Sequence, residues 1–198
     1  MINILQIGSN DATDDCFSFI ESIDKKFIDN LILIEPQKKY NIKLKEKYKD
    51  IKNLYIENIV ITDNEEIDEI DFYIVIDYVG TKDQVSSINK KHALNHGITE
   101  DEIECTKIEA STINKILKKY NIYELDYLFI DSEGTDSIII KSIDYKKYNI
   151  QNIEYENLHI DNNNLCNFLE SKGYKVIQNI GSNGWSNRAI KYNFSDIA

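Results

Sequence analysis

Short apolar runs alternate with windows of helical periodicity along most of the chain. The runs suited to strands cover residues 2–7, 31–35, 53–58, 125–131 and 150–156. Between the first two runs, Phe17, Ile20 and Ile23 share one face of a helix expected over residues 13–24. This alternation predicts βαβ units around a largely parallel sheet, which is an α/β fold.

The other expected elements continue the alternation of strands and helices, except in an irregular stretch around residues 63–105. Pro36 suits the first turn of a helix that continues to residue 48. Further helices are expected over residues 111–120, after Gly134 and over residues 162–172. The runs YKVI and RAIKYNF after Gly173 predict an antiparallel hairpin at the sheet edge. We expect a single domain over residues 1–198, with a lid or insertion around residues 63–105.

Composition and charge narrow the class of protein. The chain has 198 residues, of which 42% are hydrophobic, enough for one core. Its net charge of −11, without a basic stripe, disfavours nucleic acid as a partner. The three cysteines are odd in number and widely separated, which predicts free thiols. No apolar run is long enough for a membrane span, so we expect a soluble, cytoplasmic protein.

The first strand leads directly into Gly8 and the acidic sequence SNDATDD. A nicotinamide dinucleotide calls for G-x-G-x-x-G, whereas Asp11, Asp14 and Asp15 would repel its phosphates. S-adenosylmethionine carries a sulfonium and an ammonium and no phosphate, so it suits this turn. Glu35, at the end of the second strand, could accept hydrogen bonds from both ribose hydroxyls. The alternative for these features is an ordinary βα turn and a solvent-facing strand end.

Several segments, in order along the chain, resemble the FkbM-type S-adenosylmethionine-dependent methyltransferases. They include LQIGSNDATDD, LILIEPQKKYNIKLKEKY, IDSEGTD and IEYENLHI. The D-x-E-G of IDSEGTD and the N-D-x-x-x-D of the first turn are the more specific motifs. The resemblance implies a single-domain Rossmann-like class I methyltransferase fold, with a mostly parallel seven-stranded sheet whose last strand is antiparallel. It also implies O-methylation of a hydroxyl on a sugar or natural product.

The resemblance also implies roles for individual residues around the cofactor. These are Gly8, Ser9, Asn10 and Asp11 at the methionine portion, Glu35 at the ribose, Asn58 or the turn near Asp63 beside adenine, and Asp131 beside the transferring methyl. Ala12 stands where the family usually has a second glycine, which predicts a stiffer turn.

Methyl transfer to a hydroxyl requires a group that removes the proton. Four candidates follow the fourth and fifth parallel strands: Asp131, Glu133, Glu156 and His159. Carboxylates brought together raise one another's pKa, which makes one of them a better base near neutral pH. Alternatively, Asp131 and Glu133 only orient cofactor and backbone, or they bind Mg²⁺ together with Glu156, a cofactor we do not favour.

Four polar residues of the irregular stretch are candidates for contact with the acceptor: Ser86, Ser87, His92 and His96. The two histidines are four residues apart and would share a helix face, although they lack a third metal ligand nearby. They could instead be surface or lid histidines. Trp185 could stack on a sugar ring or act as a packing anchor.

These features favour an enzyme that transfers a methyl group from S-adenosylmethionine to a hydroxyl of a sugar, glycan or glycan precursor. Two alternatives remain: a module that binds the cofactor without transfer, and a Rossmann-like domain that binds a nucleotide sugar. The sequence does not indicate the oligomeric state.

Overall fold

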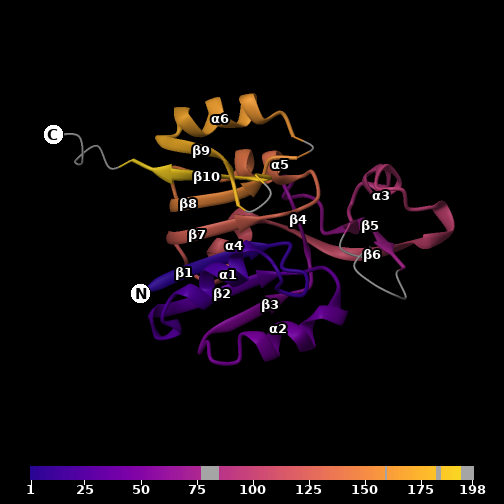
Figure 1. The fold of residues 1–198 in the computed structure, drawn as a ribbon, viewed down its shortest axis with the longest axis horizontal. Coiled ribbons are helices and arrows are strands. Elements are labelled where there is room, and N and C mark those ends of the chain that lie inside the picture. Colours follow the sequence, from indigo (N-terminus) through magenta and orange to yellow (C-terminus); the bar gives the residue numbers. More distant parts are fainter. Residues whose placement is uncertain (77–84, 159, 182–183, 193–198) are drawn as a thin grey trace.

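The computed structural model describes residues 1–76, 85–158, 160–181 and 184–192. Its main sheet has seven strands in the order β3-β2-β1-β7-β8-β10-β9 (Figure 1). The strands are β1 (Ile2–Ile7), β2 (Ile28–Ile34), β3 (Leu54–Glu57), β7 (Glu124–Ile130), β8 (Asn149–Glu156), β9 (Tyr174–Ile180) and β10 (Ser186–Lys191). The first five strands of that order pair in parallel, and β10 is antiparallel to both β8 and β9. The predicted α/β fold with an antiparallel last strand is confirmed.

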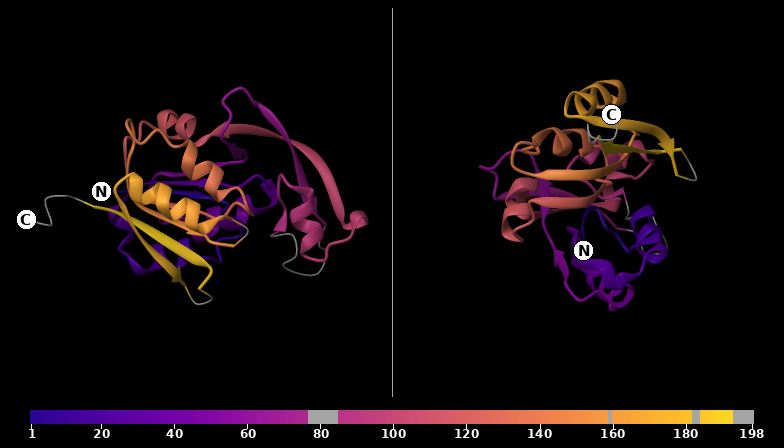
Figure 2. Two further views of the ribbon diagram at one scale, coloured as in Figure 1. Left: turned by 90° about the horizontal axis from the view of Figure 1, so that it is seen from above. Right: turned by 90° about the vertical axis from the view of Figure 1, so that its left-hand side faces the viewer.

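Helices cover both faces of this sheet (Figure 2). The helices are α1 (Asp15–Ser22), α2 (Asn41–Lys47), α4 (Ile113–Lys119), α5 (Asp136–Ser142) and α6 (Asn162–Ser171). Because successive strand residues face opposite sides, Ile4 packs with α1 and α2 while Leu5 packs with α4, α5 and α6. Two apolar cores result, one on each face. Among the described helices, none is long and apolar enough to cross a membrane.

A second, three-stranded sheet extends from one side of the main sheet (Figures 1 and 2). It is formed by β4 (Val60–Thr62), β5 (Glu69–Val75) and β6 (Ile103–Thr112), and it carries the helix α3 (Lys90–Asn95). The sequence predicted an irregular stretch here, and within it β5 and β6 pair in antiparallel orientation. The length of β6 was not expected, because its residues 104–109 are largely exposed and lack an apolar run.

Two helix starts differ from the sequence expectation, and in each case a carboxylate explains the difference. Helix α1 begins only at Asp15, because the Asp14 side chain accepts the Phe17 N–H at 2.9 Å and caps the helix. The prediction of Pro36 in a first helical turn is wrong. The Glu35 carboxylate accepts the Gln37 N–H at 2.8 Å, and α2 starts at residue 41 after a 3₁₀ turn.

The ends of β1 and β7 approach each other too closely for any side chain at Gly8. The Asp131 N–H donates to the Ile7 carbonyl at 3.0 Å, which continues the pairing of the two strands. Gly8 has φ +82°, and a Cβ atom there would lie 1.8 Å from the Asp131 carbonyl oxygen. Glycine is therefore required at this position both by backbone conformation and by the neighbouring strand.

Replacing Gly8 with alanine should destabilise the protein much more than the same change at Gly173. Gly173 has φ +87° but no atom within 4 Å of a built Cβ, so Gly173→Ala meets only the conformational cost of about 1–2 kcal/mol. Gly8→Ala also forces β1 and β7 apart, and we expect a loss of roughly 3 kcal/mol or more. Urea denaturation of both variants measures the difference. Equal losses would show that the close approach is unimportant.

Candidate active site

A cavity of about 390 Å³ opens at the carboxyl ends of β1, β2 and β7. Ligands of open α/β sheets bind at this edge. Gly8 and Asn10 line it from the turn after β1, Glu35 from the end of β2, and Asp131 and Glu133 from the loop after β7. Five of the residues predicted from the sequence therefore meet in one place.

The Glu35 carboxylate connects the turns that follow β1 and β2. It is 4% exposed, and its two oxygens accept the N–H groups of Asn10 and Gln37, each at 2.8 Å. The carboxylate therefore holds the two turns in a fixed relation to each other. Asn10 and Ala12 have φ of 47° and 55°, a conformation unusual for residues other than glycine. The turn thus holds strained backbone, which is frequent at binding sites.

The side of the cavity facing the second sheet is apolar. Four residues form this wall: Ile59, Val60, Ile61 and Phe72. Asn58 and Asp63 were expected here, but neither is among the described lining residues. The Asn58 amide instead donates to the Glu35 carbonyl at 2.8 Å, and so supports the end of β2. The apolar run between these two polar residues forms the wall, and the sequence analysis did not identify it.

Two other predicted cofactor residues stabilise the first turn and are not among the described residues that line the cavity. Ser9 is fully buried, and its hydroxyl donates to the Ile34 carbonyl at 3.2 Å. Asp11 accepts the Thr13 hydroxyl at 2.7 Å and lies 3.4 Å from the Lys43 ammonium. Both residues shape the backbone that presents Asn10.

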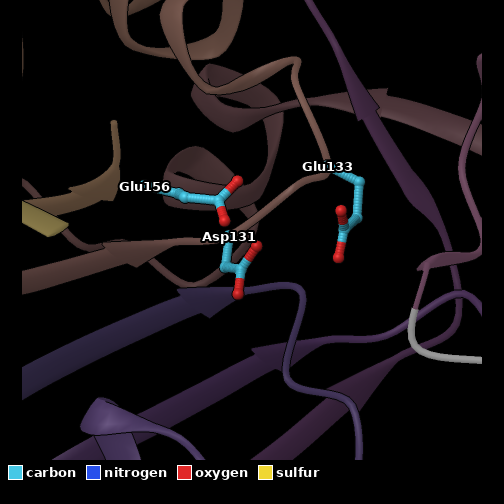
Figure 3. Close-up of side chains that lie close together, drawn as sticks. All are labelled: Asp131, Glu133 and Glu156. Atoms are coloured by element: carbon cyan, nitrogen blue, oxygen red, sulfur yellow. The ribbon is translucent and has the colours of Figure 1, made fainter. Parts of the chain in front are cut away.

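Three carboxylates converge beside the cavity, two of them among its lining residues: Asp131, Glu133 and Glu156 (Figure 3). One oxygen from each lies within 4.8 Å of the others. Crowding by neighbouring protein atoms, followed by the charges of Glu133 and Glu156, raises the pKa of Asp131 well above its usual value, although the residue is exposed to solvent. Burial and the Glu133 charge raise the pKa of Glu156 to about 7. Such a group can accept a proton near neutral pH, and its oxygens would also suit a hard cation.

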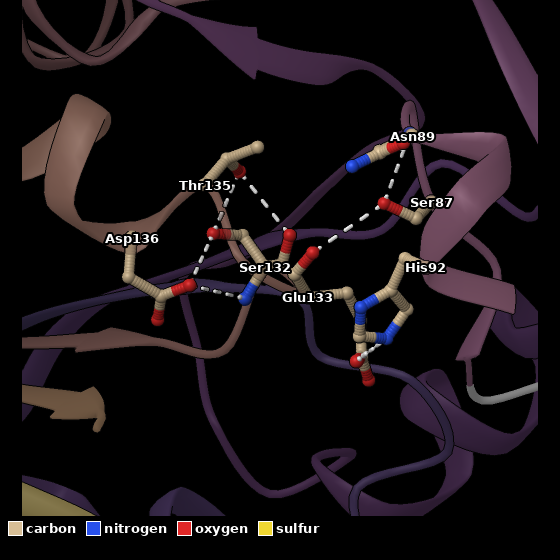
Figure 4. Close-up of polar contacts among 7 residues, drawn as sticks. All are labelled: Ser87, Asn89, His92, Ser132, Glu133, Thr135 and Asp136. Carbon is tan, nitrogen blue, oxygen red and sulfur yellow. Dashed lines mark hydrogen bonds and ion pairs between the residues drawn. The ribbon is translucent and has the colours of Figure 1, made fainter. Parts of the chain in front are cut away.

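The helix α3 reaches this cluster through His92 (Figure 4). His92 is 6% exposed, and its Nε2 lies 2.6 Å from a carboxylate oxygen of Glu133. The Ser87 hydroxyl donates to the Glu133 carbonyl at 3.5 Å, and Ser86 and Ser87 both line the cavity. The exposed His96 ring lies 4.6 Å from that of His92. The second sheet therefore contributes polar groups to the site.

His159 lies outside the described residues, so its expected role stays a prediction.

Asp136, which sequence reasoning missed, fixes the loop after β7 (Figure 4). It is fully buried at the start of α5 and accepts the Ser132 hydroxyl at 2.9 Å. Burial raises its pKa to about 6. Glu133, next in this loop, has φ 54°. An acid at the expected first turn of the helix after Gly134 was the available signal.

The family model described as the methyltransferase FkbM domain matches residues 6–176. No curated protein matches the chain. The crystal structure of methyltransferase FkbM from Methylobacillus flagellatus KT matches with a TM-score of 0.58 at 12% identity. That match covers 96% of this chain and 43% of the other, so this chain spans less than half the length of that protein.

Two further solved structures have TM-scores below 0.5. The O-methyltransferase from Bacillus cereus in complex with SAH has a TM-score of 0.48 at 10% identity, covering 96% of this chain and 74% of that one. The CurJ carbon methyltransferase has a TM-score of 0.46 at 8% identity, covering 97% and 49%. At these scores they carry no argument about the reaction. Because the family model covers most of the chain, in agreement with the fold and the motifs, the protein belongs to the methyltransferase FkbM domain family.

Proposed function

We propose that the protein transfers a methyl group from S-adenosylmethionine to a hydroxyl of a sugar, glycan or glycan precursor. The observation that carries this proposal is the cavity at the strand ends, where Glu35 and an apolar wall lie opposite a cluster of carboxylates. Membership of the family supports methyl transfer. The acidic site and the net charge of −11 support a small acceptor over nucleic acid.

The residues around the first cavity fit this cofactor. The cavity volume of about 390 Å³ lies in the range of small-molecule sites. The apolar wall of Ile59–Ile61 and Phe72 suits a flat base, and the Glu35 carboxylate suits the ribose hydroxyls. Asp131 provides negative charge for a cationic sulfur compound. When bound, the cofactor supplies an electrophilic methyl group on a positively charged sulfur.

The protein must hold the acceptor in line with that methyl group and remove its proton. Asp131 is our candidate base, because its raised pKa allows it to take the hydroxyl proton. With that proton taken up by Asp131, the site would hold the acceptor oxygen facing the methyl group that the bound cofactor would supply. Glu156 and the His92–Glu133 pair surround the base and set its charge environment. We propose that this step needs no metal ion, although the three carboxylates could hold one.

Replacing Glu35 with glutamine should weaken binding of S-adenosylmethionine by roughly tenfold or more, through loss of a charged acceptor. The variant Glu57→Gln is a control one strand away, because Glu57 ends β3 and is not among the residues described as lining the cavity. Calorimetry measures both affinities, and thermal unfolding checks that each variant is folded. Unchanged affinity in Glu35→Gln would contradict the ribose role.

Replacing Asp131 with asparagine should reduce turnover by roughly a hundredfold or more, while cofactor affinity changes much less. Since a base works only when deprotonated, turnover of the native protein should rise with pH as Asp131 loses its proton. Radiolabelled methyl transfer to a panel of sugars, repeated with EDTA present, measures both effects. A native turnover rate in Asp131→Asn would rule out the base role, and loss of turnover in EDTA would require a metal.

Replacing Glu156 with glutamine should stabilise the protein at pH 8, because the charged carboxylate is disfavoured in the folded state. We expect a gain of roughly 1 kcal/mol, since solvent screening limits the effect for a partly exposed group. The pKa of Glu156 rises from 4.5 to about 7 on folding, so between these pH values the folded state binds a proton at Glu156 that the unfolded state has lost. Stability of the native protein should therefore fall as pH rises from about 4.5 to 7, and less so in Glu156→Gln. Urea denaturation across this range provides the test. Parallel curves would contradict the raised pKa.

A further inference from the structure

A second cavity, of about 400 Å³, lies on the other side of Asp131. Thr13, Asp14 and Asp131 line both cavities, so the two are adjacent. The rest of its wall comes from β1, the start of α1, the ends of β7 and β8 and the hairpin between β9 and β10. The cavity includes Asp131 and Glu156 of the carboxylate cluster, and α3 supplies none of its described lining residues.

Among the described lining residues, charge in the second cavity is negative throughout. Its acids are Asp14, Asp15, Asp131, Glu154 and Glu156, and the described lining contains no lysine or arginine. Arg188 pairs with Glu154 at 2.8 Å and compensates one charge. Burial raises the pKa of Asp14, and the charge of Asp15 adds to the effect. The cavity therefore gathers five acids beside one cationic side chain, and a bound cation would favour their charged forms.

The buried side chain of Gln6 is a second, independent reason to expect that this cavity binds a hydrogen-bond donor. Its side chain is 3% exposed and lines the cavity. The amide nitrogen donates to the Asp14 carboxylate, whereas Oε1 has no partner within the part of the chain that the structure describes. Buried acceptors are normally satisfied, so this oxygen indicates a donor supplied from outside the chain.

Trp185 lies at the rim of the same cavity and is 53% exposed. An exposed indole can pack against the apolar face of a sugar ring, and it attracts a nearby cation through its π-system. The rim therefore suits a ring that carries positive charge.

We propose that the second cavity binds the acceptor through a protonated amine, with the acceptor an amino sugar or a similar amine-bearing polyol. This inference rests on the proposed function and deepens it, because it assigns the class of the acceptor. Asp14, Asp15 and Glu156 receive the ammonium group, and Gln6 accepts one of its hydrogens. A hydroxyl on the same ring then faces Asp131 at the junction of the two cavities.

The chain has a single tryptophan, so its fluorescence reports on this cavity. Near pH 7, titration with glucosamine should give a saturable change, with and without saturating S-adenosylhomocysteine. N-acetylglucosamine, which lacks the charge, should need at least roughly tenfold higher concentration. Equal responses to the two sugars, or no response to glucosamine, would overturn the inference. Calorimetry with S-adenosylhomocysteine alone separately tests the proposed function.

Variants connect the signal to the cavity. Asp15→Asn should weaken glucosamine binding by roughly tenfold and leave S-adenosylhomocysteine affinity within about twofold, since Asp15 is not among the described lining residues of the first cavity. Glu46→Gln removes an exposed charge from α2 and should change neither affinity. Unchanged glucosamine affinity in Asp15→Asn would overturn the assignment. So would displacement of glucosamine by Mg²⁺ alone, which would indicate a metal site.

Discussion

The close approach of β1 to β7 determines where the chemistry of this protein can take place. Gly8 has no side chain, so the two strand ends lie in contact and Asp131 emerges directly beside the turn after β1. The same contact leaves a cavity on each side of Asp131. Any residue larger than glycine would push the strand ends apart and separate Asp131 from the turn. The backbone contact between the two strands therefore determines the position of the proposed base.

The two cavities differ in the partners of their acidic side chains. In the first, two backbone N–H groups hold the Glu35 carboxylate in one orientation. In the second, acids lie together with little compensation, and several of their pKa values are raised. A carboxylate held in one orientation suits the hydroxyls of a ribose, and a cluster of acids suits an ammonium group. These properties support the proposed ribose contact in the first cavity and the proposed amine contact in the second.

The sequence could predict those parts of the fold and site that depend on residues adjacent along the chain. Gly8, Glu35 and Asp131 each follow an apolar strand, and parallel strands bring their carboxyl ends to one edge. The apolar wall of the first cavity was not predicted, because its place there depends on how the second sheet packs and not on local polarity. Asp136 was not predicted, because only its burial distinguishes it from other acids near the starts of helices. The second cavity depends on long-range contacts between α1, β8 and the last hairpin, which no local pattern encodes.

The strand order β8-β10-β9 has a consequence for how the protein is made. Strand β9 leaves the ribosome before β10, yet its place in the finished sheet is separated from β8 by the width of one strand. The pairing of β8 with β10, and with it the place of β9 in the sheet, is therefore possible only after β10 has been synthesised. The buried Asn187 joins the three strands, because its side chain donates to the Tyr155 hydroxyl of β8 and accepts the Asn179 N–H of β9. The wall that carries Trp185 is therefore completed only after β10 has been synthesised, later than the strands whose ends form the first cavity.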